Sequence, residues 1–136
     1  MEENQLARTL PEATVQEIQL ELIRRTRFDA FDGERVVADL LAHRDLWTAA
    51  MMDRFCFSRP GKLPSIGLIK LRDLADNFWN VDTLYVLTPD AKTASQLAQI
   101  ADNWGGEARV HDAVDEVEEA LGAYGMEAAV VSVWWD

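Results

Sequence analysis

Three aspartates occupy positions where their carboxylates could act together, because Asp90, Asp112 and Asp136 each follow a segment that we expect to form a β-strand. In an open parallel sheet, ligands bind beyond the carboxyl ends of the strands, near the point where the strand order reverses. Carboxylate oxygens are the ligands that Mg²⁺ prefers, and an ion held in this way assists hydrolysis and phosphoryl transfer. The alternative is structural, since aspartate after a strand is a preferred helix N-cap and a terminal Asp136 can fray. We favour the structural alternative and keep the Mg²⁺ site as the sharper hypothesis.

Other reactive groups lack the partners that catalysis or metal binding would need. Cys56 is the single cysteine, so an internal disulfide is excluded, and with only His43 and His111 beside it the chain has no ligand set for structural zinc. Cys56 lies between two phenylalanines, where a buried, unreactive thiol is expected.

Nucleotide-binding motifs are missing. The turn Thr88–Asp90 contains no glycine, so the glycine-rich turn that lets a backbone approach a pyrophosphate is absent. The segment 60–63 lacks the upstream glycine and the following Ser or Thr of a P-loop. No cofactor is therefore expected, with Mg²⁺ as the one ion to consider.

The charge of the chain is unevenly distributed. The net charge is −11, and residues 1–72 hold eleven basic and eleven acidic side chains, whereas residues 73–136 hold two basic and thirteen acidic ones. Such a surface repels nucleic acid and anionic membranes, so neither is an expected partner. A basic protein surface is the partner that it would attract. The candidate docking residues are Glu116, Glu118 and Glu119.

A second candidate contact lies in the polar stretch before residue 83. Phe78 and Trp79 stand between asparagines and could serve as aromatic anchors in a protein interface. The stretch is rich in side-chain oxygens, but it lacks the spacing and the central glycine of a Ca²⁺-binding EF-hand loop. A turn with both rings tucked under the sheet is the alternative that we favour.

The sequence predicts a cytoplasmic protein. No apolar run approaches the roughly 18 residues of a membrane helix, and the N-terminus has neither a basic start nor an apolar signal segment. Together these patterns favour a non-catalytic, acidic protein-binding or regulatory module. The alternative function is a Mg²⁺-dependent hydrolase or phosphate-handling protein that uses the three aspartates, so whether the chain is an enzyme stays open.

The N-terminal region of the chain is predicted to be helical. Thr14 to Glu17 has the form of a capping box and predicts a helix over about 14–27, and Asp32 is an N-cap candidate for a second helix. The spacing of Trp47, Met51 and Phe55 continues a helical period. We divide a single domain, residues 1–136, into a helical region over residues 1–57, a linker over residues 58–64 with two prolines and a glycine, and a remainder over residues 65–136 whose first stretch, 65–82, has no clear form.

The C-terminal region alternates between the periods of strands and helices. Residues 83–88 and 108–111 read as strands, and each is followed by an amphipathic helix. The first helix has its apolar face at Ala94, Leu97, Ala101 and Trp104, and the second has it at Val114, Val117, Leu121 and Tyr124. Residues 127–136 are apolar on both faces, which predicts a third strand inside a sheet that is covered on both sides.

This alternation favours an α/β fold in which N-terminal helices precede a βαβαβ unit. We expect a three-stranded parallel sheet in the order second, first, third strand, equivalent to half of a Rossmann-like fold. The sheet would keep an open side at its third strand, which a loop, the segment 66–74 or a second subunit must cover, and we favour the second subunit. A homodimer is therefore a further expectation.

Overall fold

The computed structural model describes residues 9–53, 60–61, 71–125 and 127–135. Its strands are β1 (Ala49–Asp53), β2 (Thr83–Thr88), β3 (Glu107–His111) and β4 (Ala129–Trp134). Its main helices are α2 (Val15–Arg25), α3 (Gly33–Ala42), α5 (Ala91–Ala101) and α6 (Val114–Leu121). Short 3₁₀ turns are η1 (Leu10–Glu12), η2 (Arg44–Leu46) and η3 (Asp102–Trp104). No helix in these described ranges is long and apolar enough to cross a membrane.

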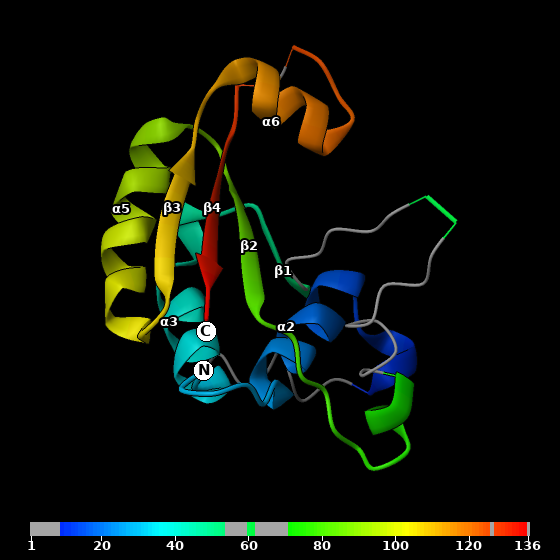
Figure 1. The fold of residues 1–136 in the computed structure, drawn as a ribbon. Helices are drawn as coiled ribbons and strands as arrows, with labels where there is room; N and C mark the ends of the chain where they lie inside the picture. Colours follow the sequence, from blue (N-terminus) through cyan, green and yellow to red (C-terminus); the bar gives the residue numbers. More distant parts are fainter. Residues whose placement is uncertain (1–8, 54–59, 62–70, 126, 136) are drawn as a thin grey trace.

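The four strands form one antiparallel sheet in the order β1-β2-β4-β3 (Figure 1). The predicted three-stranded parallel, Rossmann-like sheet is therefore wrong. Its physical basis was partly sound, because β2 and β3 are both antiparallel to β4 and so run in the same direction, joined by α5. The last strand, β4, enters between them and pairs with both, which splits the βαβ unit.

The region after η2 also differs from the prediction. The helical period expected over Trp47, Met51 and Phe55 is wrong, since residues 49–53 form β1, and Phe55 lies outside the described residues. Ala50 and Met52 are buried while Met51 is 41% exposed, which is the period of a strand. Pairing with β2 outweighs the helix propensity of alanine and methionine here.

The helix starts follow the sequence signals closely. In the capping box of α2, the Glu17 N–H donates to Thr14 Oγ1 at 3.1 Å and the Thr14 N–H donates to Glu17 Oε1 at 2.8 Å. Asp32 caps α3 by accepting from the Arg35 N–H at 3.2 Å. Both predicted N-caps are confirmed.

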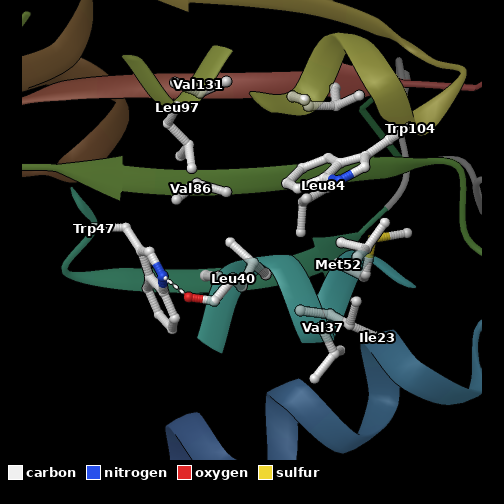
Figure 2. Packing of buried hydrophobic residues seen from close by; sticks show 14 of the residues in the cluster. Ile23, Val37, Leu40, Trp47, Met52, Leu84, Val86, Leu97, Trp104 and Val131 are labelled. Carbon is white, nitrogen blue, oxygen red and sulfur yellow. Dashed lines mark hydrogen bonds between the residues drawn. The ribbon is translucent and has the colours of Figure 1, made fainter. Parts of the chain in front are cut away.

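The core lies on one face of the sheet, between the strands and the helices α3 and α5. Figure 2 shows Val86 of β2 next to Leu97 of α5, and Leu84 of the same strand next to Trp104, with Leu40 of α3 on the side towards α2. Tryptophans fix this layer with their indole N–H groups, and the Trp47 N–H donates to the Leu40 carbonyl at 2.8 Å (Figure 2). Burial is thus concentrated on the inner face, and the opposite face carries the more polar residues of the same strands.

The outer edge of β1 is covered by α2. The side-chain amide of Gln16 donates to the Ala50 carbonyl at 2.7 Å and accepts from the Ala50 N–H at 2.9 Å. It thereby makes the pair of hydrogen bonds that a neighbouring strand would make, which protects the edge from pairing with another chain.

Candidate functional site

The antiparallel topology separates the places where the three predicted metal ligands would lie. Asp90 follows β2 and Asp112 follows β3, and β4 lies between these two strands. Trp134, at the carboxyl end of β4, pairs with Thr83 and Glu107 at the amino ends of β2 and β3. The chain therefore leaves β4 at the opposite end of the sheet, where Figure 1 shows the C-terminus, far from α6.

Asp90 and Asp112 thus follow strands that finish at the same end of the sheet, whereas β4 finishes at the opposite end, so the three strand ends do not meet at one edge. Asp136 itself lies outside the described residues. Asp90 serves as the N-cap of α5, and hydrogen bonds from the backbone and side chain of Thr93 lower the pKa of its carboxyl group. Within the described ranges no group of three or more His, Cys, Asp or Glu side chains is placed to hold a metal ion. Binding of Mg²⁺ itself stays an untested prediction.

The predicted docking residues fall in two places. Glu116, Glu118 and Glu119 lie on α6, where Glu118 accepts a hydrogen bond from the Gly125 N–H at 2.7 Å. Phe78 is 39% exposed, whereas Trp79 is partly buried against the core and forms an isolated bridge with Thr26.

A cavity of about 360 Å³ lies on the sheet face opposite to the core, which we call the open face. Its lining residues come from three adjacent strands, β2, β4 and β3. They are Thr83, Tyr85, Glu107, Arg109, His111, Ser132 and Trp134. The volume is within the usual range for small-molecule sites. None of these residues was predicted as a site residue from the sequence. His111 was named only in excluding a structural zinc site.

The strand register arranges the lining in rows across the sheet. In the first row, Thr83 pairs with Trp134, which pairs with Glu107. In the next row, Tyr85 pairs with Ser132, which pairs with Arg109. Directly paired residues on one face have neighbouring side chains. Ser132 is therefore flanked on both sides, by a phenol and by a guanidinium group.

His111 lies one row further along and connects Ser132 to α6. Its Nε2 is 2.8 Å from Ser132 Oγ, and its Nδ1 is 3.5 Å from Oε1 of Glu116. Glu116 belongs to the first turn of α6, which follows β3 after a short connection. The ring nitrogens thus lie between a hydroxyl group and a carboxylate.

The charges of the cavity are largely compensated. Arg109 Nη2 is 3.1 Å from Glu107 Oε2 in an exposed ion pair. Burial, followed by the negative charges of Asp53 and Asp82, raises the pKa of the Tyr85 hydroxyl. Tyr85 therefore keeps its proton at neutral pH and can donate a hydrogen bond. Trp134, 39% exposed, adds the large apolar surface.

Comparison with known proteins adds no functional information: no family model, no curated protein and no solved structure matches the chain. The function has to be argued from the residues of the open face. The sequence did contain a signal for this face. Ser132 interrupts an apolar strand, and the polar residues Arg109 and His111 alternate with apolar residues along β3. Only the antiparallel register shows that these polar positions share one side of the sheet.

Proposed function

We propose that the protein binds a small carbonyl-containing molecule with an apolar part in the cavity of the open face. The observation that carries this proposal is the convergence of Tyr85, Arg109, His111, Ser132 and Trp134 on one cavity. Ligand sites combine an apolar wall with a few polar groups that fix the orientation of the ligand. Trp134 provides such a wall, and the polar groups provide hydrogen-bond donors for an oxygen acceptor.

The electrostatics favour a ligand of low net charge. Arg109 is already paired with Glu107, and His111 faces Glu116. A strongly anionic ligand would have to displace a carboxylate, and the chain as a whole carries a charge of −11. A neutral carbonyl oxygen can instead accept from Tyr85 or Arg109 without breaking a charge balance.

Nuclear magnetic resonance titration with para-nitroacetanilide, a neutral aromatic amide, tests the proposal. We expect shifts of the Trp134 indole signal and of the backbone amides around Tyr85 and Ser132. Trp134→Ala should weaken binding by about 3- to 10-fold, the usual value of an aromatic contact. Tyr124→Ala is the matched control, because Tyr124 is an 85% exposed aromatic residue outside the cavity lining. Shifts that avoid the open face, or that persist unchanged in Trp134→Ala, would reject the proposal.

A second function, docking of a basic partner protein, is supported by the surface of α6. Three apolar residues of its predicted apolar face are exposed, namely Val114 at 63%, Leu121 at 36% and Tyr124 at 85%, and only Val117 of this helix is buried. The same helix carries acidic residues at 115, 116, 118 and 119 and no basic residue. An apolar stripe bordered by carboxylates is complementary to a basic amphipathic segment.

A synthetic amphipathic peptide of leucine and lysine, titrated at low salt, tests this second function. Binding should shift the signals of α6, weaken in Tyr124→Ala and in Glu119→Lys, and fall as salt is added. Trp134→Ala is the control here, since it lies at the other end of the sheet. Equal binding by Glu119→Lys and the unchanged protein would rule out docking on α6 through its charge.

A further inference from the structure

The contacts of Ser132 distinguish it from an ordinary polar residue in a strand. Its Oγ lies 2.8 Å from Nε2 of His111, and Nδ1 of the same ring faces the Glu116 carboxylate at 3.5 Å. A carboxylate can only accept hydrogen bonds, so it favours the tautomer with the proton on Nδ1. Nε2 is then an acceptor, and the Ser132 hydroxyl donates to it.

This order of groups is the one that activates a serine for nucleophilic attack. A hydroxyl group bonded to a histidine, whose other nitrogen is oriented by a carboxylate, recurs on unrelated folds and is recognised by geometry. The 3.5 Å between His111 Nδ1 and Glu116 Oε1 is long for a hydrogen bond, and catalytic contacts of this kind often shorten only when substrate is bound. We propose that Ser132 is a nucleophile for acyl transfer from small esters, with His111 as its general base and Glu116 as a positioning residue. This inference rests on the proposed ligand cavity.

The reaction needs no component beyond the ester and water. Ser132 Oγ forms a bond to the ester carbonyl carbon while its proton passes to His111 Nε2, and the carbonyl electrons move onto oxygen. The tetrahedral species then expels the alcohol, which takes the proton from Nε2 and leaves Ser132 acylated. Water attacks the acyl carbon, gives its proton to Nε2, and the carboxylic acid leaves as the proton returns to Ser132 Oγ.

Stabilisation of the negative oxygen must come from side chains. Ser132 lies in β4, a strand paired on both sides, so the ladders with β2 and β3 occupy its backbone donors. Tyr85 and Arg109, which flank Ser132 in its own row, are donors that line the open face. The Tyr85 hydroxyl and the Arg109 guanidinium therefore take the role that backbone N–H groups have in most acyl-transfer sites.

The experiment incubates the full chain with para-nitrophenyl acetate and follows both phenolate release and the intact mass. We expect a burst of phenolate and one acetyl group located on Ser132 by peptide mapping. Ser132→Ala should lose this acetyl group, whereas Ser95→Ala, a change of an exposed serine on α5, should keep it. His111→Gln should slow acylation by about 100-fold or more, the usual contribution of a general base.

Glu116 needs a measurement that a purely structural role would not affect. Glu116→Gln should lower the acylation rate and displace its pH profile, and Glu116→Asp should restore some of both. Ser132→Cys retains a nucleophile at the same place and should again be acetylated by the ester. It also guards against the case in which Ser132→Ala fails only because it does not fold.

The outcomes separate this inference from the proposed function. Binding of para-nitroacetanilide on the open face without acetylation of Ser132 would leave the ligand cavity in place and overturn the nucleophile. If para-nitroacetanilide did not bind on the open face and Ser132 was not acetylated, both the proposed ligand cavity and the nucleophile would be overturned. Acetylation confined to Lys92 or to the N-terminal amine, with the same rate in His111→Gln, would also overturn the assignment of Ser132.

Discussion

Replacing Gln16 with alanine tests how the free edge of the sheet is protected. The Gln16 amide makes two hydrogen bonds to Ala50 in β1, at 2.7 and 2.9 Å, and alanine would remove both. A hydrogen bond contributes about 0.5–1.5 kcal/mol net to stability. Since two are lost at a half-buried position, we expect Gln16→Ala to lower the free energy of unfolding by about 1–3 kcal/mol.

Urea denaturation followed by circular dichroism measures this change. If the dependence of the unfolding free energy on urea concentration (the m-value) is unchanged, only stability was altered. Gln96→Ala is the matched control, because Gln96 is exposed on α5 and such changes usually stay within about 0.5 kcal/mol. Gln16→Glu keeps an acceptor for the Ala50 N–H but brings a carboxylate against the Ala50 carbonyl, so we expect it to be at least as destabilising. If Gln16→Ala matched Gln96→Ala, the covering of the β1 edge by this side chain would be refuted.

Three more predictions concern single positions. Gly33→Ala should lower the melting temperature strongly, because a Cβ would lie 2.3 Å and 2.6 Å from carbonyl oxygens at the end of α2, and a normal melt would contradict this contact. Thr14→Ala should cost about 1 kcal/mol of unfolding free energy through the lost N-cap, and Glu17→Gln should cost less; equal costs in denaturant titrations would argue against the capping box. Burial raises the pKa of Tyr85 above 10.0 in the folded protein. The contribution of its protonated hydroxyl to the free energy of unfolding is therefore complete below pH 10 and is lost as the pH rises through the folded pKa. Ultraviolet titration of Tyr124→Phe should show the remaining tyrosine ionising above pH 10, and ionisation at the value of free tyrosine would contradict its burial.

The elements with local signals could be predicted from the sequence. The capping box at Thr14 and the cap at Asp32 mark helix starts through contacts within a few residues, and both are present. The apolar face of α5 was correct in detail, because Ala94, Leu97 and Ala101 are all buried. Helical spacing and N-cap chemistry act over one or two turns, so no tertiary information is needed to place them.

Strand pairing could not be predicted in the same way. The apolar pattern of residues 127–136 correctly predicted a strand with a neighbour on each side, β4 over Ala129–Trp134, but the expected cover on both faces is wrong, since Trp134 is 39% exposed on the open face. The pattern also carries no information on strand direction. Alternation of strands and helices suggested parallel neighbours, and β2 and β3 do share a direction across α5. The insertion of β4 between them depends on contacts between residues far apart in the sequence, which local periods do not record. The same holds for β1, whose strand form depends on its pairing with β2.

The candidate site required that register. Tyr85, Ser132 and Arg109 come from three separate strands, and a shift of one residue in either ladder would turn one side chain to the core face. In the sequence, Ser132 is one polar residue in an apolar strand, and Arg109 is one charged residue in a short strand, so neither position alone indicates a site. The sequence instead indicated a site at the three aspartates, because each follows a predicted strand. For Asp90 this position is explained by its role as the N-cap of α5.

The two proposed functions meet at one side chain. Glu116 faces His111 on the open-face side of its helix and also belongs to the acidic border of the exposed apolar residues of α6. Only Val117 of this helix is buried, so few contacts hold α6 in place. A partner that bound α6 would then alter the carboxylate that orients the His111 ring, and with it the acceptor that Ser132 needs. Coupling of this kind is reciprocal, so a ligand that tightened the contact between His111 and Glu116 would change the affinity of α6 for its partner by the same factor.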